Sequence, residues 1–229
     1  MVMKHKKRFI LLNFTFYLMT IAIVFIIARF TKPTKVTSSI YEKNINNCVE
    51  ICSYDSDSNL SYGTGWFIDE QTIVTNYHVV NTKTTSIRFF DEETYTNISI
   101  INFDSKLDIA LLKYEGTHVH SYFKTTTNYI TSEECYCIGN YQNFGLSFKK
   151  GYISLAAVDL EYNEVYQEFI QCSIGIGQGD SGAPLFNQNY ECLGMITLRK
   201  KNQLGNIEEC FGYAIPISKI NELKSKINR

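Results

Sequence analysis

The apolar positions of the chain fall into one long run near its start and many short runs after it. The long run, residues 9–28, carries no charge and has no polar face at a helical period. A helix of this length measures about 30 Å, which matches the hydrocarbon core of a bilayer. We therefore expect a membrane-spanning helix at 9–28, with a basic flank at 1–8 and a polar stalk at 29–45.

A cleaved signal peptide is the alternative interpretation of residues 9–28. The run is longer than the apolar core of a typical signal peptide, which has about 7–15 residues. No small-x-small cleavage site follows it. The basic residues at 4–8 favour a cytoplasmic N-terminus by the positive-inside rule, against a weaker basic cluster at 29–35. We expect a single-pass protein whose remaining domain lies outside the cytoplasm.

Beyond the stalk, short apolar runs alternate with turn residues, which is typical of an all-β protein. A polar connector at 116–128 divides the runs into two series. The expected strands are 65–68, 72–75, 87–90, 98–103 and 109–114, then 135–139, 146–155, 169–173, 183–186, 192–198 and 211–215. Ile220, Leu223 and Ile227 recur at helical spacing, so we expect a C-terminal helix with Ser218 as its N-cap.

Composition restricts the function further. Apolar residues make up 45% and aromatic residues 14% of the 229 positions, as suits a packed domain rich in strands. The net charge of −1 gives no basic excess for binding nucleic acid. The seven Cys residues contain no C-x-x-C pair with a matching partner pair, so no metal site is expected. Buried thiols and one or two disulfides are both compatible with them.

Three segments carry candidate catalytic chemistry, and the first is 177–184. Ser181 lies there between two glycines of a Gly-Asp-Ser-Gly sequence, with Gly179 two positions before it. A serine hydroxyl is a poor nucleophile until a base removes its proton. Gly179 allows the backbone to aim N–H groups at a developing oxyanion. The same sequence is also common in surface turns, so this segment alone does not decide the function.

The other two segments supply a base and an acid. His78 ends an apolar run and meets a polar loop, whereas His118 and His120 are expected in solvated loops. Asp108 leads directly into an apolar run, where a carboxylate needs a partner. The order His, Asp, Ser matches the chymotrypsin arrangement. It differs from that of α/β-hydrolases, which run Ser, acid, His around a G-x-S-x-G turn.

These segments resemble trypsin-like peptidases of the chymotrypsin fold, and most of all the HtrA-like (Deg) proteases, over roughly residues 60–227. Other stretches similar to that family are 137–140, 151–154, 169–171, 194–197 and 211–216. The resemblance implies an all-β protease domain at 46–229 with two antiparallel six-stranded barrels, at about 46–115 and 129–217, and a short C-terminal helix. The sequence ends soon after that helix, so we expect a protease domain without the family's usual PDZ domain.

The resemblance also implies an activity: a serine endopeptidase acting on proteins or peptides without a cofactor. Ser181 would attack the carbonyl, His78 would accept its proton, and Asp108 would orient His78. The N–H groups of Gly179 and Ser181 would form the oxyanion hole. The implied substrate pocket comprises Gly175, Met195, Ile196, Thr197 and Tyr213. A catalytically silent protease-fold binding module at the membrane surface is the main alternative, and an esterase is another.

Asp180 raises the question of activation, because HtrA-like proteases usually carry Asn there. In the trypsin branch, an acid at this position pairs with an N-terminal amine that zymogen cleavage releases. That amine belongs to an Ile-Val-Gly-Gly-like start, which is missing upstream of His78. We therefore expect a domain that needs no processing. Asp180 should face solvent or accept hydrogen bonds from nearby backbone N–H groups.

Overall fold

The structure, a computed structural model, describes residues 36–54, 59–81, 84–91, 93–96, 98–118, 120–198 and 211–227. The expected membrane helix at 9–28, its flank at 1–8 and the first part of the stalk lie outside these residues. Among the residues described, no helix has both the length and the apolar character needed to span a bilayer. The chain divides into two units, and the fold and the site belong to the second, Ile40–Arg229.

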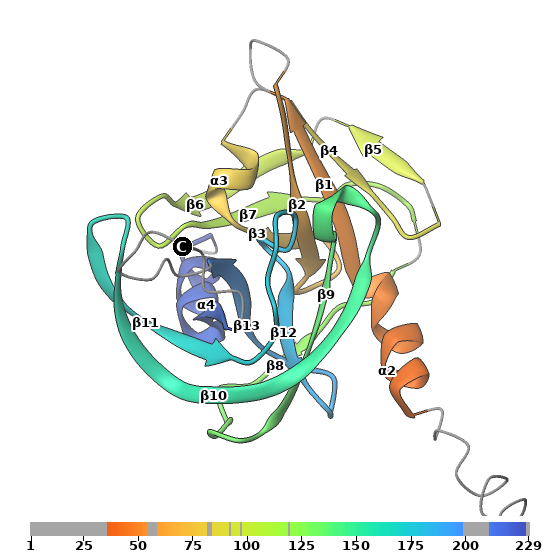
Figure 1. The fold of residues 1–229 in the computed structure, drawn as a ribbon. Helices are drawn as coiled ribbons and strands as arrows, with labels where there is room; N and C mark the ends of the chain where they lie inside the picture. Colours follow the sequence, from red (N-terminus) through yellow and green to blue (C-terminus); the bar gives the residue numbers. More distant parts are fainter. Residues whose placement is uncertain are drawn as a thin grey trace, which may run out of the picture. The chain divides into compact units, whose positions relative to one another are not determined.

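The first half of this unit forms a seven-stranded antiparallel sheet in the order β5-β4-β1-β2-β3-β7-β6 (Figure 1). Its strands are β1 (Cys48–Tyr54), β2 (Leu60–Phe67), β3 (Thr72–Thr75), β4 (Thr84–Arg88), β5 (Thr94–Thr96), β6 (Ser99–Asp104) and β7 (Ile109–Lys113). Successive side chains of a strand point to opposite faces. In β7, Ala110 and Leu112 therefore pack into one core cluster and Ile109 and Leu111 into another.

The second half forms another seven-stranded sheet in the order β12-β9-β10-β11-β14-β13-β8. Its strands are β8 (Lys124–Thr125), β9 (Glu134–Gly139), β10 (Ser147–Tyr162), β11 (Val165–Cys172), β12 (Pro184–Asn187), β13 (Glu191–Leu198) and β14 (Gly212–Pro216). Because β12 also pairs with β13, the six strands from β9 to β14 close into a ring. Figure 1 shows β10 as a long, strongly curved strand of this ring.

The expectation of a mainly β domain followed by a short helix is confirmed, but the two expected antiparallel six-stranded barrels differ from the observed sheets. Each sheet has seven strands instead of six, and only the second closes through pairings among the described residues. The two-residue strand β8 arises from the expected connector and pairs in parallel with β13. β1 was not predicted, since Glu50 interrupts its apolar residues. Arg88 Nη2 pairs with Glu50 Oε2 at 2.7 Å, which stabilises the charge within the sheet.

The described helical elements are α2 (Val36–Asn44), η1 (Ile45–Asn47), α3 (Tyr77–Val80), η2 (Tyr141–Asn143) and α4 (Ile217–Ser225). The C-terminal helix is confirmed, but the predicted cap is wrong: Ser218 lies inside α4, which starts at Ile217 after Pro216. Ile217 is buried together with Ile220 and Leu223, so packing of this face sets the start of the helix. Ile227 lies beyond its end.

The compact unit begins within the segment expected to be a stalk. Ile40 and Ile45 are buried in the core. Tyr41 Oη donates a hydrogen bond to the carbonyl of Leu146 at 3.2 Å, and its ring packs edge-on against Phe148. Residues from Ile40 onward therefore contribute to the folded domain.

The described cysteines are free thiols: Cys48, Cys52, Cys135, Cys137, Cys172 and Cys192. All but Cys52 are buried. Burial raises the pKa of the Cys48 and Cys137 thiols well above the usual value, so both stay neutral. Of the two interpretations of the cysteines, the described part of the chain supports small apolar side chains in the core. Cys210 lies outside the described residues.

Candidate active site

The three predicted catalytic residues come from turns and a short helix beside the sheets. His78 lies in α3, directly after β3, and Asp108 lies in the turn before β7. Ser181 lies in the turn between β11 and β12. Two side chains of the second sheet donate hydrogen bonds to Asp108, in the turn before β7 of the first sheet. Thr197 Oγ1 donates to Asp108 Oδ2 at 3.0 Å, and Tyr162 Oη donates to the same oxygen at 2.9 Å. The two sheets therefore meet at Asp108.

The carboxylate of Asp108 accepts four hydrogen bonds. Besides Thr197 and Tyr162, His78 contributes two, from Nδ1 to Oδ2 at 2.7 Å and from its backbone N–H to Oδ1 at 2.9 Å. The side chain of Asp108 is only 2% exposed, so these donors replace the water that an ionised carboxylate needs. Burial and the charge of Asp108 raise the pKa of Tyr162, which keeps its phenol protonated as a donor.

The backbone of Asp108 is held as firmly as its side chain. Its φ is +58°, a left-handed conformation that costs a non-glycine residue on the order of 1 kcal/mol. Its carbonyl accepts hydrogen bonds from Asn76 Nδ2 at 2.9 Å and from the N–H of Tyr77 at 3.2 Å. Asn76 Nδ2 also donates to Thr197 Oγ1 at 3.0 Å. These bonds offset the strain and fix the carboxylate toward His78.

His78 is anchored on one side and open on the other. Its Nδ1 is engaged by Asp108, while its side chain is 45% exposed, which leaves Nε2 for a further partner. Within the described residues, no hydrogen bond joins His78 to Ser181. Such bonds often form only when substrate binds. The two segments approach each other at Gly63, where a Cβ would lie 2.8 Å from Val79 and 2.9 Å from the carbonyl oxygen of Ser181.

The turn before Ser181 presents backbone N–H groups. Among the described residues, no backbone acceptor takes the N–H of Gly179 or of Ser181. The neighbouring carbonyls are held elsewhere: Thr64 Oγ1 donates to the carbonyl of Gly179 at 2.8 Å, and the N–H of Gln142 donates to that of Gln178 at 2.7 Å. Gly179 has a φ of +93°, which favours glycine. This arrangement can stabilise an anionic oxygen.

The predicted pocket residues fall into three groups. Met195, Ile196 and Tyr213 are buried, and Tyr213 Oη accepts a hydrogen bond from Gln171 Nε2 at 2.9 Å. Gly175 is exposed. The hydroxyl of Thr197 is committed to Asp108, so its role in the site includes holding the acid.

Asp180 is buried, so the expectation that it either faces solvent or accepts backbone N–H groups is met by the second arrangement. Its Oδ2 accepts a hydrogen bond from the N–H of Gly177 at 2.7 Å. The same oxygen forms an ion pair with Lys149 Nζ, a partner that the sequence interpretation missed.

Tyr162 was also missed, although the sequence contained a signal for it. β10 was expected at 146–155, but it continues to Tyr162. Val158, Leu160 and Tyr162 recur at every second position and pack against the core, which is the period of a half-buried strand. Extending the expected strand by this alternation would have predicted that Tyr162 lies on its half-buried face.

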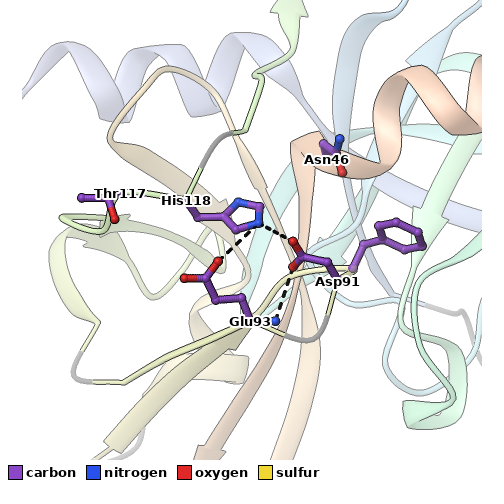
Figure 2. A pocket seen from close by; sticks show the side chains of 6 residues that line it. Asn46, Asp91, Glu93, Thr117 and His118 are labelled. Carbon is purple, nitrogen blue, oxygen red and sulfur yellow. Dashed lines mark hydrogen bonds and ion pairs between the residues drawn. The ribbon is translucent and has the colours of Figure 1, made fainter.

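A second group of titratable side chains consists of Asp91, Glu93 and His118 (Figure 2). His118 Nε2 lies 2.8 Å from Asp91 Oδ2 and 3.6 Å from Glu93 Oε2. The hydrogen bond to His118 holds the pKa of Asp91 below its usual range. His118 was expected in a solvated loop, but its side chain is only 11% exposed and stacks on Phe89. His120 is likewise stacked, on Phe67.

This group has two carboxylates and an imidazole, which are ligand types of a cation site. Its three ligand atoms lie within 4.8 Å of one another. A metal-bound His, however, normally donates its other ring N–H to an acceptor that fixes its orientation. In the described part of the chain, the buried Nδ1 of His118 has no hydrogen-bond partner. The group is better explained as a hydrogen-bonded cluster that anchors its loop.

Comparisons with known proteins agree with this geometry. A family model described as a trypsin-like peptidase domain matches residues 63–195. A probable periplasmic DegP-like serine endoprotease of Bartonella henselae is 29% identical over 171 residues, which cover 73% of this chain and 33% of that protein. A protein of the same description from Rickettsia conorii is 31% identical over 161 residues, covering 67% of this chain and 31% of the relative. The chain thus spans about a third of the length of these relatives.

Solved structures share the fold. A protease from M. tuberculosis in its active form matches with a TM-score of 0.75 at 18% identity, over 86% of this chain and 87% of that one. A serine endoprotease from Yersinia pestis matches with a TM-score of 0.70 at 23% identity, over 85% and 67% of the two chains.

The packing of Gly179 predicts a difference between two glycine substitutions. Gly145 and Gly179 both have positive φ, +100° and +93°, but a Cβ at Gly145 meets nothing within 4 Å. At Gly179 it would lie 2.0 Å from the carbonyl oxygen of Asn140. Gly145→Ala should lower the free energy of unfolding by about 1–2 kcal/mol through backbone strain. Gly179→Ala should lose about 1–3 kcal/mol more through overpacking. Urea denaturation measures both, and equal losses would contradict this packing.

Proposed function

The chain belongs to the trypsin-like peptidase family, and from this premise we propose that it is a membrane-anchored serine endopeptidase with Ser181 as its nucleophile. The observation that carries the proposal is the 2.7 Å hydrogen bond between His78 Nδ1 and the buried Asp108 carboxylate, beside the turn of Ser181. It holds the imidazole in the tautomer whose Nε2 can accept a proton.

In the proposed acylation, Ser181 Oγ attacks the carbonyl carbon of a peptide bond while its proton moves to His78 Nε2. The resulting oxyanion accepts hydrogen bonds from the N–H groups of Gly179 and Ser181. His78 then donates the proton to the leaving amine, and the C–N bond breaks to give an acyl-enzyme on Ser181. Water, deprotonated by His78, attacks this ester and releases the acid. Asp108 stabilises the imidazolium in both steps.

The alternative, a catalytically silent binding module, explains less of the geometry. A binding module has no need for a strained Asp108, or for a buried carboxylate that accepts four hydrogen bonds. Such features cost stability when they serve only the fold. Catalysis requires an acid that is fixed and charged next to the base, which accounts for them.

Loss of either proposed catalytic group should abolish peptide hydrolysis. Ser181→Ala and His78→Ala should each lower kcat by at least about a thousandfold, with residual turnover from the oxyanion hole. Ser225→Ala, on the exposed face of α4, is the matched control and should retain full activity. Hydrolysis of a fluorogenic peptide measures the effect, and circular dichroism checks folding. Wild-type turnover in either variant would refute the assignment.

We further propose an apolar primary substrate pocket formed by Gly175, Met195, Ile196, Thr197 and Tyr213. By its resemblance to the family, Gly175 would lie near the base of this pocket, six residues before Ser181, and no carboxylate is present at that position to bind Lys or Arg. The burial of Met195, Ile196 and Tyr213 is consistent with apolar walls.

This pocket predicts cleavage after small or medium apolar residues. Peptide-library cleavage read by mass spectrometry tests it, with Ser181→Ala as the blank. Gly175→Asp should shift the preference toward Lys and Arg, because a carboxylate at the base would pair with their charge. A wild-type enzyme that already prefers Lys or Arg would contradict the proposed pocket.

We also propose that residues 9–28 anchor the protein, with the catalytic domain outside the cytoplasm. The uncharged run behind a basic flank supports this, as does the description of relatives as periplasmic. Protease added to intact spheroplasts should remove the domain while a cytoplasmic marker survives. Full protection of the domain until the membrane is broken would contradict the orientation.

A further inference from the structure

The residue before the proposed nucleophile is an acid in the interior of the protein. The side chain of Asp180 is 0% exposed, and an ionised carboxylate there costs several kcal/mol unless donors or cations compensate it. Lys149 Nζ forms an ion pair with Asp180 Oδ2, and the N–H of Gly177 donates to the same oxygen. The interior is packed closely around it, since a Cβ at Gly139 would lie 2.5 Å from Asp180 Oδ1.

Lys149 contacts more than the carboxylate. Its ammonium donates to the carbonyl of Gly175 at 3.2 Å and lies 4.4 Å from the centre of the Tyr141 ring. It therefore connects both ends of the segment from Gly175 to Asp180 with β10 and η2. This segment, together with Ser181, is called the oxyanion loop below.

The ion pair holds the side chain of Asp180 in the interior of the protein. Gly179 and Ser181, whose N–H groups would form the oxyanion hole, directly flank Asp180. The position of the Asp180 side chain therefore constrains the positions of both N–H groups. Neutral hydrogen bonds to the carbonyls of Gln178 and Gly179 support the loop, but they do not compensate the charge of Asp180. Without the ammonium, the buried carboxylate would favour moving toward water.

The adjacent lysine shows that this contact is specific to one position. Successive residues of β10 point to opposite faces, so Lys150 lies on the other side of the strand. There it pairs with Glu134 at 2.9 Å and is 42% exposed, whereas Lys149 is 18% exposed.

We propose that Lys149 is a positioning residue that holds the oxyanion loop in its active conformation through Asp180, without proteolytic processing. Its ammonium supplies from within β10 the cation that trypsin-branch enzymes obtain from a newly released N-terminus. This inference rests on the proposed peptidase function, and it concerns the orientation of the oxyanion hole instead of the chemistry of the nucleophile.

The test compares four variants of the purified full chain. Lys149→Met removes the charge and should lower kcat by about a hundredfold, the size of effect expected when an oxyanion donor is lost, with a smaller change in KM. Lys149→Arg keeps the charge and should retain activity within about tenfold. Lys150→Met is the matched control and should match the wild type. The double variant Lys149→Met/Asp180→Asn should be more stable than Lys149→Met, because no buried carboxylate remains.

Chemical rescue separates positioning from a purely structural role. Alkylammonium ions added to Lys149→Ala should restore part of kcat, whereas sodium at equal ionic strength should not. Unchanged kcat in Lys149→Met would overturn the inference. If that variant fails to fold, wild-type kcat in folded Lys149→Ala without added alkylammonium ions would overturn it equally.

The outcome for the wild type distinguishes this inference from the proposed function. A full chain that becomes active only after N-terminal cleavage would overturn the role of Lys149 and leave the peptidase assignment standing. A chain that is inactive both before and after trimming would contradict the peptidase assignment, and the inference would fall with it.

Discussion

The cost of burying charge governs the site of this protein. Asp108 and Asp180 are almost completely removed from solvent, and each needs donors or a cation to stay ionised. Asp108 obtains its donors from both halves of the domain, with His78 from α3 and with Tyr162 and Thr197 from the second sheet. Asp180 obtains a cation from β10. Asp108 therefore fixes the position of His78, and Asp180 connects the turn of Ser181 with β10.

Close contacts of the β2 backbone also fix the segments of His78 and Ser181 relative to each other. Gly63 lies between Val79, which follows His78, and the carbonyl of Ser181. Thr64, the next residue, donates its N–H to that carbonyl at 2.9 Å and its hydroxyl to the carbonyl of Gly179. A single segment of β2 thus sets the spacing between the general base and the nucleophile turn. Larger side chains there would separate the two groups on which the proposed reaction depends.

Local patterns in the sequence predicted much of this fold. β3 was expected at 72–75 and begins and ends at those residues, because bends at 68–71 precede it and α3 begins two residues after it. The segments of His78, Asp108 and Ser181 were identified from the short sequences around them. Long-range partners were not: Lys149 and Tyr162 lie 31 and 54 residues from the carboxylates they contact. No local period encodes such pairs, although a buried acid by itself indicates that a partner must exist.

The central claim is that Ser181 is a nucleophile activated by its surroundings. The most direct measurement is the mass of the peptide that contains Ser181 after the folded chain reacts with a fluorophosphonate, which modifies activated serines. The account predicts a single phosphonylated residue, Ser181, and no adduct in the urea-unfolded chain or in His78→Ala. A folded wild-type chain that forms no adduct, or forms one on a different serine, would contradict it.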